Sequence, residues 1–490
     1  MLKAAVISDI HLDLSGRAPM GGREFDLGDL MVKRLVHRLN RFIKPDITIF
    51  LGDLVDEGEG PAASEHYTRL KDQVDRIASP TIVIPGNHDG AAFDDVFGPP
   101  AEITDCAGVR FIACVDPEEP GYNARRLPEG FDLMNRARRG HSGPIVLLQH
   151  VPVLPIGSHE CPYSYLNVDR IIAQMKASNI GLALSGHYHT GVDRVDHDGM
   201  IFHTVAALCE RPFCFDVAQI GEGCVEIQHH QLVPAPRPGL VDTHVHTQFS
   251  YCGPTMDIKT TEALAPKLGL EGLALTEHSG QLYYDESTYW SGNWFPLGSP
   301  FSSISAECRL GSYLDAAREV RDPSILIGFE ADCRSDGTLV LDRIERPDIV
   351  LGSVHQMDSV TWRLHGAEPM TSAISDEFLG LNESLVRNGV DIVAHPFRIL
   401  TGVSGVESLY GPMVELLHRN GVAAEINFHL NDPPPEFFAT CLARGVRVAL
   451  GSDAHEHWEL GDFVPHIEFL SQLGFTGDLP DITYQGKRCS

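Results

Sequence analysis

Apolar residues gather into short runs along the first half of the chain, and each run ends in a cluster of Asp, His or Asn. The spacing between runs suits helices, since residues 27–43 repeat apolar side chains at steps of three and four. Uninterrupted apolar runs are typical of strands buried on both faces. Alternating strands and helices predict a layered α/β fold, with residues 200–231 as its closing strands. The runs are residues 4–11, 47–56, 81–89, 145–150 and 181–189.

A change in composition divides the chain near its middle. Residues 233–239 read Val-Pro-Ala-Pro-Arg-Pro-Gly, which favours a stiff linker. Beyond it, seven further apolar runs end at polar residues, with helical segments such as 262–268 and 372–388 between them. Seven βα repeats of this kind predict a closed or nearly closed barrel. We therefore expect one domain over residues 1–232 and a second over residues 240–490.

Side chains suited to metal ions stand at the ends of the runs in the first half. Alternate residues of a strand share a face, so Asp-Ile-His presents an Asp and a His to the same side. Carboxylate, imidazole and amide oxygen together suit two divalent ions such as Mn, Fe or Zn. A carboxylate that bridges two ions about 4 Å apart leaves room for a hydroxide that attacks phosphorus. The residues are Asp9, His11, Asp53, Asn87, His88, His150, His187 and His189.

With these motifs in this order, residues 1–230 resemble the calcineurin-like metallophosphoesterase superfamily. The resemblance implies a first ion held by Asp9, His11, Asp53 and His189. It implies a second ion held by Asp53, Asn87, His150 and His187, so that Asp53 bridges the two. His88 matches the family's histidine that protonates the leaving oxygen or steadies the phosphoryl group. Two further carboxylates that follow the motifs are interpreted as loop and capping groups, Asp56 and Asp89.

The second half carries a comparable set at its predicted strand ends. His-x-His on one strand offers two imidazoles to one ion, and Asp-x-His on the last strand closes the ring. Barrel enzymes place their catalysis at this face. Glu425 is interpreted either as structural or as a partner of a ligand. The predicted ligands are His244, His246, His278, Glu330, His355, His395, Asp453 and His455.

This second set resembles the PHP domain (polymerase and histidinol phosphatase family) over about residues 240–470. The resemblance implies a distorted (βα)7 barrel with two or three ions. One ion would be held by His244, His246, Glu330 and Asp453. A second would be held by Glu330, His355 and His395, and a third by His278 and His455.

The chain departs from the PHP pattern at Cys252, which stands where many members have a further His or acidic residue. A thiolate there would favour a softer ion such as Zn. The alternative is a weak or empty third site, with Cys252 a small buried residue. Arg398 could clamp a phosphate as a catalytic group, with a surface role as its alternative. The aromatic-rich residues 280–307 would form either a lid or base-stacking wall over the barrel mouth, or plain packing under a long loop.

The composition narrows the substrates and the cellular location. The net charge of −29 comes from 38 basic and 67 acidic side chains, and such a surface repels polyanions. Nucleic acid is therefore disfavoured as a partner. No apolar run is long enough to span a membrane, and the apolar N-terminus is too short for a signal peptide. The 11 cysteines form no C-x-x-C pair, which fits reduced thiols, so we expect a cytoplasmic protein.

Together these features predict a metal-dependent hydrolase of phosphate esters with two active sites. The expected substrates are small phosphodiesters or phosphomonoesters such as nucleotides, and the two sites could act in relay on one substrate. One alternative is a DNA or RNA nuclease or end-processing enzyme. The other is that one domain is a non-catalytic scaffold stabilised by its metal. The sequence leaves the oligomeric state open.

Overall fold

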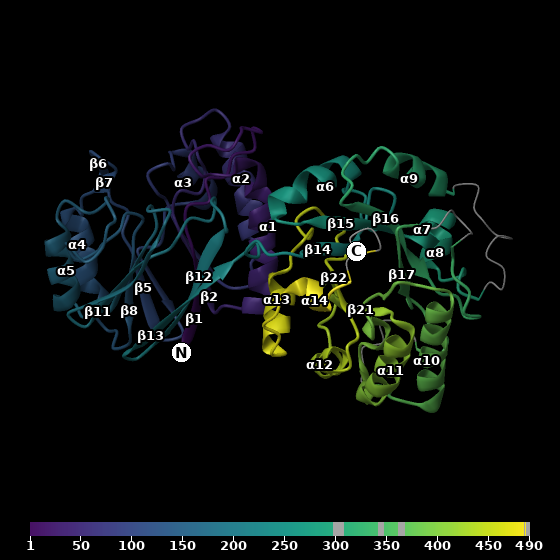
Figure 1. Cartoon of the computed structure of the whole chain (residues 1–490). Helices are drawn as coiled ribbons and strands as arrows, with labels where there is room; N and C mark the ends of the chain where they lie inside the picture. Colours follow the sequence, from purple (N-terminus) through teal and green to yellow (C-terminus); the bar gives the residue numbers. More distant parts are fainter. Residues whose placement is uncertain (297–307, 342–346, 361–367, 485, 487–490) are drawn as a thin grey trace. The chain divides into compact units, whose positions relative to one another are not determined.

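The computed structural model describes residues 1–296, 308–341, 347–360, 368–484 and 486. The chain divides into two compact units, Met1–Leu232 and Val233–Ser490 (Figure 1). Both units mix strands and helices, as predicted. Within the described part of the chain, no helix is both long and apolar enough to cross a membrane.

Unit 1 contains two β-sheets that share one apolar core. The order of the five-stranded sheet is β13-β12-β1-β2-β3, and that of the six-stranded sheet is β10-β11-β9-β8-β5-β4. Val6 and Ile49 of the first sheet pack in the same cluster as Val146 and Leu184 of the second. The larger strands are β1 (Leu2–Ile7), β2 (Ile47–Leu51), β3 (Thr81–Ile84), β4 (Ile103–Cys106), β5 (Val109–Ala113), β8 (Ile145–Leu148), β9 (Leu182–Ser185), β10 (Val192–His197), β11 (Met200–Thr204), β12 (Cys214–Gly221) and β13 (Cys224–Gln231).

Helices complete the layers of unit 1. Phe131 of α4 and Ile171 of α5 pack with Ile112 and Leu147, so these two helices cover the outer face of the six-stranded sheet. The helix expected over residues 27–43 is present, although its last turns widen into a π-helix. The helices are α1 (Gly28–Arg38), α2 (Ala63–Val74), α3 (Ala92–Phe97), α4 (Pro128–Ala137) and α5 (Val168–Ala177), with the short strands β6 (Glu118–Glu119) and β7 (Asn123–Ala124) before α4.

Unit 2 is a nearly closed barrel of seven parallel strands, in the order β14-β15-β16-β17-β19-β21-β22. The first and last strands meet where the Asp453 N–H donates to the His244 carbonyl at 2.8 Å and the His246 N–H donates to Ala454 at 3.1 Å. The predicted barrel is thereby confirmed. The strands are β14 (Val241–Val245), β15 (Gly272–His278), β16 (Ile325–Asp332), β17 (Ile349–Ser353), β19 (Ile392–Val393), β21 (Ala423–Asn427) and β22 (Val448–Gly451), with the outlying pair β18 (Glu368–Pro369) and β20 (Val403–Ser404).

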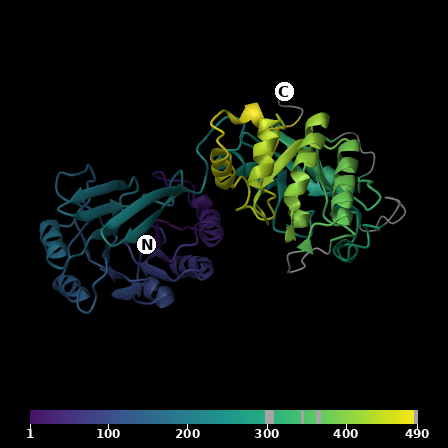
Figure 2. The ribbon, with the colours of Figure 1, turned by 90° about the horizontal axis from the view of Figure 1, so that it is seen from below.

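The helices of unit 2, teal to yellow in Figure 2, lie outside the barrel strands. Small and branched side chains of the strands, such as Ala274, Ile349 and Ala423, pack in one cluster. Ala274 shares a strand face with His278 and Ala423 shares one with Glu425, so this cluster fills the inside of the barrel. The helices are α6 (Ile258–Leu264), α7 (Ser279–Tyr283), α8 (Glu286–Trp290), α9 (Leu310–Ala317), α10 (Ser372–Arg387), α11 (Tyr410–Asn420), α12 (Pro435–Ala443), α13 (Val464–Gln472) and α14 (Leu479–Ile482).

The aromatic-rich segment after β15 is mainly core. Tyr283, Tyr284, Trp294 and Phe295 are each no more than 2% exposed and pack in one cluster with Tyr313 of α9. The packing alternative therefore holds for these side chains. Residues 297–307 of the segment lie outside the described residues.

We predict that Asp242→Ala destabilises unit 2. The Asp242 carboxylate is fully buried and accepts N–H groups of Ser452 and Gly461, both at 3.0 Å, on the far side of the barrel closure. Because unpaired buried donors cost about 1–3 kcal/mol each, the free energy of unfolding should fall by about 2–4 kcal/mol. Chemical denaturation measures it. Asp315→Ala removes an exposed ion pair and should stay within about 0.5 kcal/mol of wild type; equal losses in both variants would contradict the prediction.

Candidate metal centres

The first centre lies where the carboxyl ends of five strands of unit 1 meet. Asp9 follows β1, Asp53 follows β2, His88 follows β3, His150 follows β8 and His187 follows β9. The structure brings all eight predicted residues of this unit together, because the two sheets point these strand ends to one edge. Loops at such an edge carry side chains outward from buried strands, which is where α/β folds bind their ligands.

An unusual backbone aims these side chains inward. Asp9, His11, Asp53 and His187 all have positive φ, between 45° and 69°. Asp and His tolerate this left-handed region better than most residues, although it remains strained. The glycine of the third motif is required by space, because a Cβ on Gly86 would lie 2.2 Å from Asp53 Oδ1. The motif residues thus fit the tight turns as well as the chemistry.

Asp53 stands between two groups of ligands. Its Oδ2 lies 3.5 Å from His11 Nε2 and 3.3 Å from His150 Nε2. On the first side, Asp9 Oδ1 lies 3.9 Å from His11 Nε2 and 3.7 Å from His189 Nε2. On the second side, His150 Nε2 lies 3.1 Å from Asn87 Oδ1 and 3.1 Å from His187 Nδ1. The arrangement matches two ligand sets that share one carboxylate.

Each histidine of this centre is held by one ring nitrogen and presents the other to the site. The held nitrogens are His11 Nδ1, 3.2 Å from Asp56, and His189 Nδ1, 2.5 Å from Glu210. His150 Nδ1 is held by the Leu51 carbonyl at 2.7 Å, and His187 Nε2 by the Tyr122 carbonyl at 2.9 Å. Such partners fix the ring and its tautomer, as they do behind metal ligands.

Two carboxylates therefore have roles that the sequence did not reveal. Asp56, interpreted as a loop or capping group, contacts His11 and is itself paired with Arg17 and Arg23. Glu210 was not identified at all, because it comes from a loop after β11 that carries no motif.

The electrostatics of the first centre call for a cation. Burial alone would raise the pKa of Asp53, but His150, His11 and His88 hold that pKa well below its usual range. Burial and the neighbouring His150 lower the pKa of His187 to about 4, so this ring is neutral and free to bind a metal. Among the described residues, buried Asp9 Oδ1 and His11 Nε2 have no hydrogen-bond partner. Unpaired polar atoms of this kind are costly unless an ion satisfies them.

His88 lies at the rim of the same centre. Its backbone N–H donates to Asp53 Oδ1 at 2.8 Å, and its Nδ1 is 2.8 Å from the Asp56 carbonyl. The ring meets that of His11 edge-on, with centroids 4.7 Å apart. The residue is only partly buried, and its ligand atom lies within 4.8 Å of those of His11 and Asp53.

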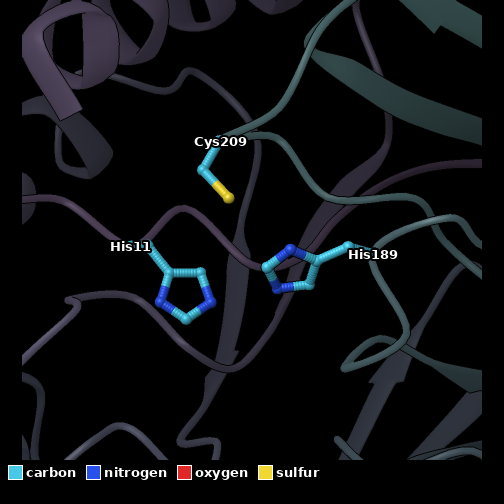
Figure 3. Close-up of side chains that lie close together, drawn as sticks. All are labelled: His11, His189 and Cys209. Carbon is cyan, nitrogen blue, oxygen red and sulfur yellow. The ribbon is translucent and has the colours of Figure 1, made fainter. Parts of the chain in front are cut away.

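A thiol that carries no sequence motif also faces this centre. Cys209 Sγ points toward the space between His11 and His189 (Figure 3), and their ligand atoms lie within 4.8 Å of one another. Burial and the nearby Asp9 and Glu210 raise the pKa of this thiol. Without an ion it is therefore neutral, and a bound cation would favour its thiolate.

The second centre is built around Glu330 inside the barrel mouth. Glu330 Oε1 lies 3.1 Å from His355 Nε2 and 2.8 Å from His395 Nε2. Its Oε2 lies 3.4 Å from His244 Nε2 and 2.5 Å from His278 Nδ1. Glu330 is thus shared between ligand sets, as Asp53 is in the first centre.

The remaining ligands of the second centre surround the last strand. Asp453 Oδ1 lies 3.0 Å from His246 Nε2 and 3.5 Å from His244 Nε2. His246, His278 and His455 have ligand atoms within 4.8 Å of one another. The structure therefore brings together all eight His, Glu and Asp residues predicted for this centre.

Buried carboxylates again support the rings from behind. His244 Nδ1 lies 2.7 Å from Glu425, and His355 Nδ1 lies 2.6 Å from Asp332. His246 Nδ1 lies 3.3 Å from Glu277. Glu425 is therefore a partner of a predicted ligand, which was one of its two interpretations. Glu277 and Asp332 were missed, although both are neighbours of predicted ligands on β15 and β16.

Charge at the second centre is also unbalanced without ions. Burial would lower the pKa of His244, but Glu425, Asp453 and Glu330 raise it well above its usual value. Several carboxylates buried in one place need protonated histidines or metal cations beside them. The Nε2 of His244 lacks a hydrogen-bond partner within the described ranges. The donor set therefore fits divalent ions.

Arg398 and Cys252 take different positions at this centre. Arg398 is 9% exposed and contacts Asp453 Oδ2 at 2.8 Å and Asn427 Oδ1 at 2.6 Å, so the surface alternative is wrong. The Cys252 thiol lies beside the Gln281 amide, with Sγ 3.2 Å from Nε2. Burial raises the pKa of this thiol to about 12. Its role as a metal ligand stays a prediction.

The two units correspond to two known families. The family model described as calcineurin-like phosphoesterase matches residues 2–191, and the model described as PHP domain matches residues 242–429. The chain joins a calcineurin-like phosphoesterase domain to a PHP domain. By family it is a metal-dependent phosphoesterase.

Curated relatives each match part of this fusion. A probable glycerophosphodiester phosphodiesterase from Arcobacter nitrofigilis is 34% identical over 85 residues, which are 17% of this chain and only 29% of that protein. A probable phosphatase from Thermoanaerobacter sp. is 24% identical, with 51% of this chain and 92% of that protein covered. A probable cyclic nucleotide phosphodiesterase from Synechococcus sp. is 28% identical, with 38% and 73% covered.

We predict that Asp332→Asn weakens metal binding at the PHP centre. The carboxylate fixes His355 through Nδ1, and loss of such a partner typically lowers metal affinity about 10–100-fold. Competition with a chelator, followed by metal analysis, measures this. Asp336→Asn changes an exposed carboxylate four residues after Asp332 and should leave the affinity at the wild-type value. Equal affinities in all three proteins would count against the role of Asp332.

We also predict that Cys209 is a ligand of the first centre. Protein loaded with Co²⁺ should show a thiolate-to-cobalt absorption band in the near ultraviolet, because a cation displaces the thiol proton. Cys209→Ser should lose most of this band, and Cys441→Ser, which changes a buried thiol on α12, should keep it. Cys252→Ser reports separately on the PHP centre. A band of wild-type intensity in Cys209→Ser would exclude this thiol.

Proposed function

We propose that the chain hydrolyses phosphate esters at two separate metal centres, with small phosphodiesters and phosphomonoesters such as nucleotides as substrates. The observation that carries the proposal is the shared carboxylate in each centre, Asp53 in one and Glu330 in the other, with imidazoles on both sides. Carboxylate-bridged pairs of ions are a recurrent solution for phosphoryl transfer to water. The relatives named as phosphodiesterases and phosphatases support the same reaction class.

In the first centre, Asp9, His11, Asp53 and His189 would hold one ion, and Asp53, Asn87, His150 and His187 the other. Ions of Mn, Fe or Zn would supply the positive charge that polarises the phosphoryl group and activates water. His88 would donate a proton or a hydrogen bond to the leaving oxygen, since its Nδ1 is fixed by the Asp56 carbonyl. The Asp56 carboxylate and Glu210 would keep the rings of His11 and His189 in their binding orientation.

In the PHP centre, two or three ions would be held by the residues around Glu330. Arg398 would contact a phosphate at the barrel mouth. Its guanidinium has five N–H donors, and the described contacts to Asp453, Asn427 and Asn431 use one donor each. The remaining donors suit the paired acceptors of a phosphate. Asp453 would therefore orient Arg398 as well as bind a metal.

The proposal predicts that the two centres fail independently. Asp53→Asn and Glu330→Gln each weaken the carboxylate that the ions share, so each should lower kcat at its own centre about 100-fold or more. A panel of phosphodiesters and phosphomonoesters, assayed with Mn²⁺, measures the activities. Asp315→Asn is a matched surface control.

Activity that one variant loses and the other keeps assigns that substrate to one centre. Two variants with wild-type activity on every ester would refute the proposal. Labelled single- and double-stranded oligonucleotides in the same panel test for a nuclease, against which the net charge of −29 weighs.

A further inference from the structure

Two connecting segments of unit 1 begin at the ends of neighbouring strands, beside the first centre, and are hydrogen-bonded to each other. Residues 114–127 follow β5 and residues 149–167 follow β8, and these two strands pair in parallel. The Ala124 N–H donates to the Ser164 carbonyl at 3.1 Å, and the Ala124 carbonyl accepts the Leu166 N–H at 2.9 Å. The Asn167 side chain adds two hydrogen bonds, since its Oδ1 accepts the Arg126 N–H and its Nδ2 donates to the Arg126 carbonyl. The connections therefore form one continuous piece of structure.

A buried ion pair braces this piece. Arg126 Nη2 lies 2.8 Å from Asp116 Oδ2, and the Tyr165 hydroxyl donates to the same oxygen at 2.8 Å. The side chains of Arg126 and Asp116 are at most 4% exposed. Separation of a buried pair leaves an uncompensated charge, so such a pair strongly resists distortion. The two connections are thus held at a fixed position over the strand ends.

The braced piece places aromatic rings against a predicted metal ligand. The ring of Tyr163 meets that of His187 edge-on, with centroids 4.6 Å apart. Tyr122 and Tyr188 each meet Tyr163 with centroids 6.3 Å and 6.1 Å apart. The Tyr122 carbonyl holds His187 Nε2, and its φ of 59° is a strained value for a bulky residue. We call Tyr122, Tyr163 and Tyr188 the tyrosine wall.

The wall is open on one side. Tyr122 is 57% exposed, although its backbone is fixed at the centre. Aromatic faces bury a large area when a ligand covers them, and nucleobases stack on such rings whatever their hydrogen-bonding pattern. A fixed, exposed aromatic surface beside ligands for divalent ions therefore suits an ester that carries both a phosphate and a planar group.

We propose that the tyrosine wall binds the nucleobase of a phosphoester whose phosphate lies at the first centre. This inference rests on the proposed function and names its substrate class. Tyr163 and Tyr122 provide the surface, and the Arg126–Asp116 pair holds it in place. A glycerol ester offers the same phosphate but nothing to cover the wall.

The test compares 3′,5′-cyclic AMP with glycerophosphoethanolamine on the Mn²⁺-loaded full chain. Stacking on one ring is worth about tenfold in binding, so Tyr122→Ala should lower the ratio of kcat/KM for the two substrates about tenfold. Leu166→Ala is the matched control, because it removes another exposed apolar side chain of the same piece, 52% exposed. Its ratio should equal that of wild type.

Binding provides a second readout that needs no turnover. Isothermal titration should show that AMP binds more tightly than glycerol 3-phosphate. The ratio of the two dissociation constants should shrink about tenfold in Tyr122→Ala. If AMP binds more tightly but neither ester is hydrolysed, the proposed function fails while the nucleobase-binding role of the tyrosine wall is upheld. If Tyr122→Ala leaves both the kcat/KM ratio and the binding difference at wild-type values, the wall is overturned.

Discussion

A carboxylate buried among imidazoles requires positive charge close to it, and the arrangement of both units follows from that requirement. Asp53 and Glu330 each lie between two sets of histidines, in places where water is excluded. Protonated histidines can supply the charge, but they then cannot bind metals. Divalent ions balance the same carboxylates and leave every ring in the neutral form that coordinates. The ligands, the strained turns and the supporting carboxylates all become intelligible once the ions are included.

Two unrelated architectures meet this requirement in the same way. A sandwich of two sheets and a seven-stranded barrel both bring the carboxyl ends of parallel strands to one edge. Parallel strands buried on both faces are rigid, so the side chains that follow them start from fixed positions. The rings are then fixed by a second layer of acceptors, such as Asp56 for His11 and Asp332 for His355. Precision comes from the strand ends, and orientation comes from the groups behind the rings.

The residues at the strand ends could be predicted from the sequence, whereas most of the groups that contact the histidine rings from behind could not. Runs of apolar residues located each β-strand that precedes a predicted ligand, and the motifs indicated these side chains because Asp, His and Asn recur there. Glu210, Glu277, Asp332 and Cys209 were missed, since each stands alone or beside a stronger candidate and only the fold decides which ring it meets. Arg398 was left between two roles for the same reason. A sequence pattern along one strand indicates on which face of the strand a side chain lies. The residue that this side chain contacts comes from another strand or loop, which the pattern does not identify.

Substrate preference is the property that the strands themselves do not determine. The predicted ligands of the first centre are positioned by the strands of the two sheets. The surfaces around the centre come from connecting segments that lie outside the sheets. A connection usually contributes little rigidity, yet here Asp116 and Arg126 form a buried ion pair within one of them, and the Tyr165 hydroxyl of the other donates to Asp116. Such pairs seldom add much stability compared with apolar packing, because desolvation offsets most of the attraction. Their use in this position is better explained by geometry: they hold Tyr122 and Tyr163 at a set distance from His187, where a flexible loop would lose affinity to the entropy of ordering.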